Sequence, residues 1–207
     1  NGVALDLNLL TGHAAQLRLA LALHARFLGV GVDVSLTSVQ EFSYELMMDS
    51  LPSQLYVTVL SLAPQRESGM LTLDLPLCLG LVDRLLGGDG KATNKRRPLS
   101  TIDQAICDNV VEAVLRTLRE SWQEFQQMEL RPIERKTDCR LLQLMSPSET
   151  LLCVCFQVGG QIEPGEIRFA VPLQSLESCL GKLTRNAAIS RKKLGTPTPP
   201  ASAPAPS

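Results

Sequence analysis

An internal duplication constrains the fold of this chain more than any other sequence feature. One repeated pair is Leu-Pro-Ser-Gln-Leu-Tyr-Val-Thr-Val-Leu at 51–60 and Ser-Pro-Ser-Glu-Thr-Leu-Leu-Cys-Val-Cys at 146–155, offset by 95 residues. A second pair is Met-Leu-Thr-Leu-Asp-Leu-Pro-Leu at 70–77 and Glu-Ile-Arg-Phe-Ala-Val-Pro-Leu at 166–173, offset by 96 residues. Segments that recur in the same order indicate one supersecondary unit used twice.

Hydrophobic periodicity predicts the same order of elements in both halves. Each half opens with a long helix, at 11–28 or 101–122, and ends with a short one, at 77–86 or 173–183. Between them we expect a strand, a linker and a two-stranded hairpin. In the second long helix apolar residues recur every four positions, at Ile102, Ile106, Val110, Val114, Leu118 and Trp122.

The start of that helix and the strands have their own signatures. Thr101 with Gln104 fits a capping box. Residues 30–36 alternate apolar and polar side chains, as a half-buried strand does, whereas 151–156 are apolar on both faces. A strand that is apolar on both faces needs cover on both sides. The sequence therefore predicts a three-layer α/β/α domain with a mostly antiparallel central sheet and pseudo-two-fold internal duplication.

The domain boundaries follow from composition. We expect one domain over 1–183, made of two similar halves at about 5–90 and 99–183. Residues 184–207 are first basic and then rich in proline and alanine, with five prolines in the last twelve residues. Such a stretch cannot form a packed core and favours extended conformations. We interpret it as a linker or tail.

Composition excludes several classes of function. A net charge of −1 and an aromatic content of 4% disfavour a nucleic-acid binder, which needs a basic stripe and stacking platforms. No basic start leads into an apolar run with a cleavage site, and the longest apolar stretch, 14–32, is interrupted by polar residues. The six cysteines lack zinc-ligand spacing and lie mostly in apolar runs, which indicates buried, reduced thiols, at Cys78, Cys107, Cys139, Cys153, Cys155 and Cys179.

Signatures of enzyme chemistry are also lacking. The run Gly87-Gly88-Asp89-Gly90-Lys91 follows a predicted helix, whereas a phosphate-binding loop precedes one. His13 and His24 lie eleven residues apart on a helix, about 16 Å, too far to share a metal ion. We expect no enzyme activity, no cofactor and no metal.

The first long helix has two apolar faces. Besides the face that should cover the sheet, a second face contains Leu19, Leu23 and Phe27. This second face is either buried within the chain or offered to a neighbouring subunit. We predict that it contributes a subunit contact, since an exposed apolar patch usually marks an interaction site.

Several motifs follow one another in a fixed order. The segment 70–90 reads as a strand leading into a short helix that ends in Gly-Gly-Asp-Gly, and Arg-Pro-Leu-Ser-Thr-Ile-Asp at 97–103 opens the second long helix. Ser-Pro-Ser-Glu at 146–149 and Gly-Glu-Ile-Arg-Phe-Ala-Val-Pro at 165–172 come later. In this order the motifs resemble the middle domain of the flagellar motor switch family FliM, whose short helix ends in Gly-Gly-x-Gly. The resemblance spans about residues 5–183 in register.

The resemblance implies a fold shared with the CheC and CheX chemotaxis phosphatases, and a non-enzymatic scaffold and signalling role in the cytoplasmic C-ring, at the inner-membrane side of the flagellar basal body. It implies a FliG-binding loop at Gly87, Gly88, Asp89 and Gly90, and contacts between neighbouring FliM copies. FliN-like proteins are expected to bind a C-terminal domain, and phosphorylated CheY an N-terminal peptide; neither segment is recognisable here.

The alternative is a CheC-like phosphatase acting on a phosphorylated response regulator. That chemistry needs an acidic side chain one helical turn before an asparagine. The asparagine of the second long helix is Asn109, and Ile106 stands where the acid is needed. Other ring-forming secretion proteins of related architecture are a further alternative.

Overall fold

The computed structural model describes residues 31–63, 66–91, 97–122 and 129–176. Within these ranges the elements follow one another as β1 (Val32–Ser43), α2 (Tyr44–Ser50), β2 (Gln54–Ala63), β3 (Ser68–Asp74), α3 (Leu75–Leu85), α4 (Thr101–Trp122), β4 (Glu129–Asp138), the 3-10 turn η1 (Cys139–Leu141), β5 (Thr150–Gly160) and β6 (Gly165–Pro172). The chain is helical again from residue 173 to the end of the last described range. No helix in these ranges is both long and apolar enough to cross a bilayer.

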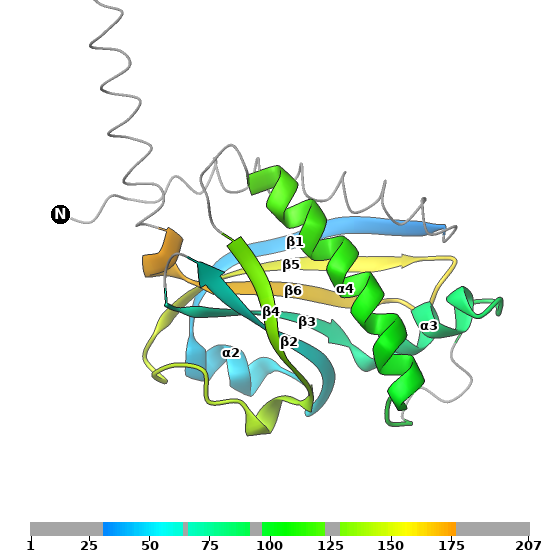
Figure 1. Cartoon of the computed structure of the whole chain (residues 1–207), viewed down its shortest axis with the longest axis horizontal. Coiled ribbons are helices and arrows are strands. Elements are labelled where there is room, and N and C mark those ends of the chain that lie inside the picture. Colours follow the sequence, from blue (N-terminus) through cyan, green and yellow to red (C-terminus); the bar gives the residue numbers. More distant parts are fainter. Residues whose placement is uncertain (1–30, 64–65, 92–96, 123–128, 177–207) are drawn as a thin grey trace, which may run out of the picture.

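The described strands form one antiparallel sheet in the order β1-β5-β6-β3-β2-β4 (Figure 1). The two hairpins, β2–β3 and β5–β6, meet along β3 and β6 at the centre. The first strand of each half pairs with the hairpin of the other half, β1 with β5 and β4 with β2. The predicted halves are therefore joined by an exchange of their outer strands.

The strand register defines the internal two-fold symmetry. The β1–β5 pairing skips Thr37, between Leu36 and Ser38, and the β4–β2 pairing skips Ile133, 96 residues later. This shared irregularity puts β1 and β4 at equivalent positions, whereas a second shift in the β4–β2 pairing, between Gln54 and Val57, has no counterpart in β1–β5. Equivalent residues of β1 and β4, and of β2 and β5, therefore lie 96 residues apart in the chain. The repeated motifs at 51–60 and 146–155 indicate 95, one residue fewer.

The second hairpin is longer than the first. Ser61 pairs with Ser68, and its equivalent Gln157 pairs with Glu166, so six residues lie between the first pair and eight between the second. Because of these two additional residues, equivalent residues of β3 and β6 lie 98 residues apart. The repeated motifs at 70–77 and 166–173 indicate 96. The pseudo-two-fold axis then passes between Leu71 and Phe169, which pair with each other.

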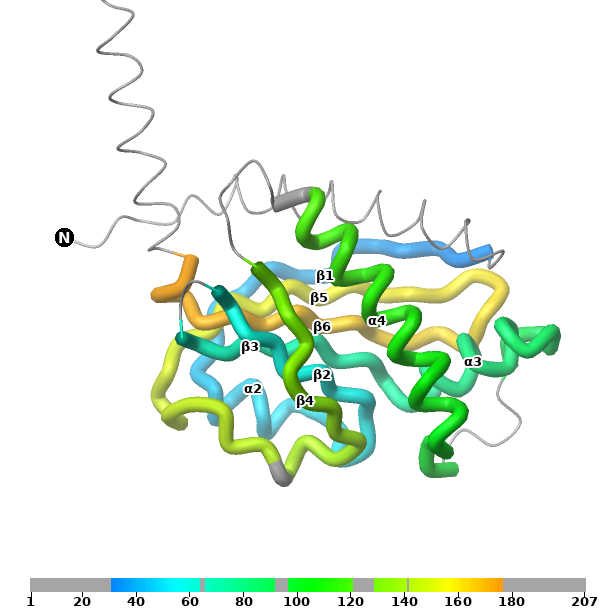
Figure 2. The backbone as a smooth tube through the Cα atoms, viewed as in Figure 1, coloured from blue at the N-terminus to red at the C-terminus, as the bar shows by residue number. Residues whose placement is uncertain are grey.

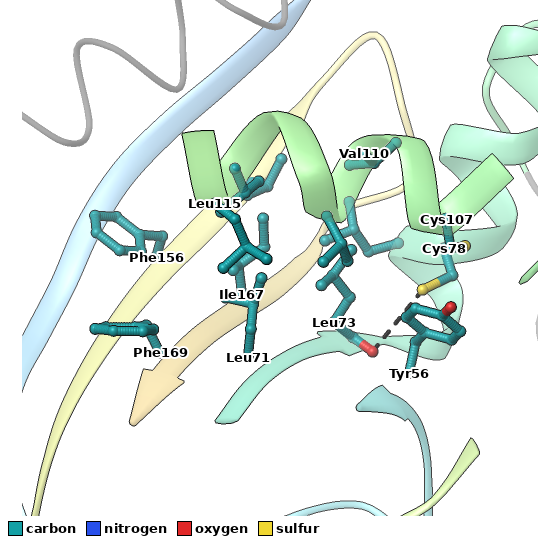
Figure 3. Close-up of a cluster of buried hydrophobic side chains, with 14 of the residues drawn as sticks. Tyr56, Leu71, Leu73, Cys78, Cys107, Val110, Leu115, Phe156, Ile167 and Phe169 are labelled. Carbon is teal, nitrogen blue, oxygen red and sulfur yellow. Dashed lines mark hydrogen bonds between the residues drawn. The ribbon is translucent and has the colours of Figure 1, made fainter. Parts of the chain in front are cut away.

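The two faces of the sheet bury separate clusters. Along β2, Tyr56 and Leu60 face α3 and α4, whereas Leu55, Val57 and Val59 face α2 and η1. Figure 1 shows α4 crossing one face of the sheet, and Figure 3 shows its side chains packed over those of β3, β5 and β6. Because side chains alternate along a strand, burial of both sets requires cover on both faces. The predicted three-layer class with its internal duplication is confirmed.

Two local expectations need correction. Helix α4 spans the predicted residues, but its capping residue is Ser100, whose Oγ accepts from the Asp103 amide at 3.3 Å, while the Asp103 carboxylate accepts from the Ser100 amide at 2.7 Å. The box therefore lies one residue earlier than the predicted pair, and Gln104 instead donates to the carbonyl of Leu99. Arg97 binds the Asp103 carboxylate and, with the Ser100 bonds, lowers its pKa to about 2.

The second correction concerns the linker of the first half. It contains α2, which is capped by Ser43 accepting from Leu46 N. Tyr44 and Met47 are buried in the cluster on this face of the sheet. Seven residues are too few for a hydrophobic period to identify, so tertiary packing rather than propensity selects this helix.

Candidate interaction site

The candidate loop follows directly from the end of α3. The amide of Leu86 donates to Val82 O at 3.0 Å, that of Gly87 to Arg84 O at 3.1 Å, and that of Gly88 to Asp83 O at 2.8 Å. These bonds satisfy carbonyls that the helix end would otherwise leave without partners. The loop is therefore an ordered continuation of the helix.

Each of the three glycines has its own intramolecular reason. Gly87 has φ 95° with open space around its Cα, so only its backbone conformation requires glycine. Gly88 needs no positive φ, but a Cβ there would lie 2.5 Å from the Cγ of Asp83. Gly90 has φ 80°, and a Cβ would collide with the carbonyl of Gln161. From sequence the glycines suggest positive φ or the approach of another molecule; positive φ accounts for Gly87 and Gly90, whereas at Gly88 a Cβ would have to displace the Asp83 carboxylate.

The β5–β6 turn supports the loop. Gly90 O accepts from the amide of Glu163 at 2.8 Å, and Arg84 donates both to Gly88 O at 3.2 Å and to Gln161 Oε1 at 3.4 Å. The amide of Gln161 in turn donates to Gly31 O beside β1. Figure 2 shows the end of α3, this turn and the start of β1 together at one end of the molecule. The turn that distinguishes the second hairpin from the first thus lies against the candidate loop.

The loop presents one large apolar side chain. Leu86 is 68% exposed, while Gly87, Asp89 and Lys91 are also exposed. Sequence analysis did not single out Leu86, because α3 is leucine-rich and periodicity alone does not separate it from the partly buried Leu85. An exposed leucine beside exposed backbone is suited to binding a protein surface.

Nothing in the described part of the chain indicates metal chemistry. No group of three His, Cys, Asp or Glu side chains there could hold a metal ion. The described cysteines are free and buried, and Cys153 Sγ lies 3.7 Å from Cys155 Sγ. The hydrogen bond from Cys153 lowers the pKa of the Cys155 thiol. Cys179, His13 and His24 lie outside the described residues.

The acidic residues in the first half of α4 already have partners. Asp103 is bound by Arg97 and Ser100, and Asp108 accepts from Tyr56 Oη at 2.6 Å and pairs with Arg135. Ile106, at the position where a phosphatase needs an acid, packs partly buried against the core. Asn109 is exposed without a carboxylate one turn before it. This arrangement does not reproduce the acid–amide pair of the phosphatase alternative.

The second predicted site cannot be placed. Leu19, Leu23 and Phe27, the apolar face of the first long helix, lie outside the described residues.

The chain matches known proteins in both sequence and structure. The model of the family "Flagellar motor switch protein FliM" matches residues 12–188. The FliM proteins of Treponema pallidum and Bacillus subtilis are each 28% identical to it, over 153 and 154 residues respectively. Both alignments cover 74% of this chain, but only 44% and 46% of those proteins. The chain therefore spans less than half the length of these curated relatives.

Solved structures of FliM proteins have the same fold as this chain. A FliG–FliM complex from H. pylori matches with a TM-score of 0.79 at 22% identity, covering 85% of this chain and 99% of that one. The FliM middle domain from H. pylori matches with a TM-score of 0.70 at 23% identity, covering 83% and 91%. The family model spans most of the chain, and so the chain belongs to the FliM family of flagellar motor switch proteins.

Proposed function

We propose that this domain is a non-enzymatic scaffold of the flagellar motor switch, which binds a FliG protein through residues 86–90. The observation that carries the proposal is the ordered loop after α3, which exposes Leu86 at 68% together with Asp89. The H. pylori FliM chain with the same fold was solved in complex with FliG. In this role the domain sits in the cytoplasmic ring at the basal body and transmits CheY-dependent switching of rotation.

The side chains of the loop, rather than its glycines, provide the clean test. The glycines support the loop's own conformation, so bulky residues at Gly88 or Gly90 would disturb the loop. A loss of binding in such variants would not distinguish a lost contact from a distorted loop. Leu86→Ser removes the exposed apolar side chain and leaves the backbone unchanged. Burying a leucine at an interface contributes about 1.5–3 kcal/mol, which corresponds to a loss of FliG affinity of roughly tenfold or more.

Leu46 offers a matched control. It is 62% exposed and lies on α2, on the opposite face of the sheet. Isothermal titration with purified FliG should show weaker binding for Leu86→Ser and unchanged binding for Leu46→Ser. Equal affinities for both variants and the parent would exclude this loop as the FliG contact.

We further propose that Leu19, Leu23 and Phe27 contact a neighbouring copy of the domain. The supporting pattern is in the sequence, where the predicted helix has a second apolar face besides the one expected to cover the sheet. The double variant Leu19→Ser/Leu23→Ser should lower self-association in sedimentation velocity while the circular dichroism spectrum is retained. Unchanged self-association would remove this contact from the proposal. The expected FliN-like and CheY contacts rest on the family resemblance alone.

A further inference from the structure

We infer that Asp83 is the positioning residue of the loop 87–90, holding it in the one conformation that a partner can bind. The geometry of the loop is independent of the partner's identity. The consequence for binding rests on the proposed FliG contact.

Asp83 binds the loop from two sides. Its main-chain carbonyl accepts from the amide of Gly88 at 2.8 Å, and its Oδ2 accepts from the amide of Gly90, also at 2.8 Å. The side chain therefore spans the loop from the last turn of α3 to the loop's final residue.

Asp83 is also the residue that a side chain at position 88 would displace, at the cost of its bond to the Gly90 amide. At Gly87 and Gly90 a positive φ requires glycine whatever surrounds it. At Gly88 the obstacle to a side chain is the Asp83 carboxylate, whose atoms are the three nearest to where a Cβ would lie. Residues 83 and 88 thus form a matched pair, in which a carboxylate fills the volume that a side chain would take.

The hydrogen bonds that Asp83 accepts compensate for the flexibility of the glycine-rich loop 87–90. Three glycines in four residues lose much backbone entropy when ordered, and an unanchored loop would lose it on binding. Asp83 orders the loop in the free protein, with help from Arg84, which donates to Gly88 O, and from the β5–β6 turn, which binds Gly90 O. Preorganisation of this kind raises affinity without adding a contact to the partner.

The test uses the full chain with Asp83→Ala, Asp83→Asn, Gly88→Ala and the double variant Asp83→Ala/Gly88→Ala. Asparagine keeps a carbonyl oxygen that can accept from Gly90, whereas alanine does not. We expect Asp83→Ala to lower the hydrogen-exchange protection of the Gly90 amide, and the affinity for FliG, at least fivefold. Asp83→Asn should restore most of both, and melting temperatures serve to confirm that all variants are folded.

The double variant tests the pairing of residues 83 and 88. Gly88→Ala should weaken FliG binding in the parent, but much less when Asp83 is already alanine, because the collision is gone. Additive effects, or unchanged protection of the Gly90 amide in Asp83→Ala, would overturn the inference.

The binding results separate the inference from the proposed function. If Leu86→Ser weakens FliG binding but Asp83→Ala does not, the loop is the contact and Asp83 does not position it. If neither variant changes the affinity, the proposed contact is itself wrong, and the role of Asp83 in binding is lost with it.

Discussion

The buried hydroxyl of Thr58 leads to the sharpest stability prediction. Thr58 is fully buried in β2, and its Oγ1 has no hydrogen-bond partner in the described structure. It lies between Tyr56 and Leu60 on the face covered by α3 and α4. A buried hydroxyl without a partner carries a desolvation penalty of about 1–3 kcal/mol.

The internal symmetry indicates which residue this position can accommodate. The offset of 96 between β2 and β5 makes Val154 the equivalent of Thr58. Thr58 pairs with Leu71 and Arg135, and Val154 pairs with the equivalent residues Phe169 and Val39. The second half thus already places a valine in this setting.

We expect Thr58→Val to stabilise the domain. Valine has the same branched shape, so the hydroxyl is removed with little change in packing. The expected gain is about 1–2 kcal/mol in the free energy of unfolding, or roughly 2–8 °C in melting temperature. The reverse substitution at the equivalent position, Val154→Thr, should destabilise the domain by a similar amount.

Urea unfolding followed by circular dichroism measures both changes, provided that the slope with denaturant stays constant. Thr117→Val is the matched control, since Thr117 is also fully buried but its hydroxyl donates to Ala113 O at 3.1 Å. We expect no gain there. The reasoning is refuted if Thr58→Val is no more stable than the parent while the denaturant slope is unchanged.

Three further predictions concern other buried groups. Tyr56→Phe removes the 2.6 Å bond from Tyr56 Oη to Asp108 and should lower the unfolding free energy by about 1 kcal/mol in urea titrations; no loss would mean that the bond is not maintained in solution. Since the folded pKa of Asp103 is lowered to about 2, its ion pair with Arg97 stabilises the fold fully above about pH 4 and is lost as pH falls toward 2. Asp103→Asn should therefore be less stable at neutral pH and lose less stability on acidification, and parallel stability–pH curves for parent and variant would contradict this. All six cysteines should be reduced thiols, so mass spectrometry of unreduced native protein should find no disulfide, and the five described ones should alkylate only after unfolding.

Local pattern determined much of this architecture. The four-residue period of 101–122 identified α4 to the residue, because a long amphipathic helix repeats its signal over many turns. The apolar run 151–156 required cover on both faces, and the repeated order of elements indicated the duplication. The ordered motifs also led to the FliM family, which the family model confirms.

Tertiary structure decided what depends on contacts distant in sequence. The exchange of β1 and β4 between the halves and the offsets of 96 and 98 rest on strand register, which similarity between weakly related segments does not define. The structural role of each loop glycine also follows only from the folded structure. A side chain at Gly88 would displace the carboxylate of Asp83. Gly90 has a positive φ and lies against the Gln161 carbonyl, which a hairpin some 70 residues later brings into place.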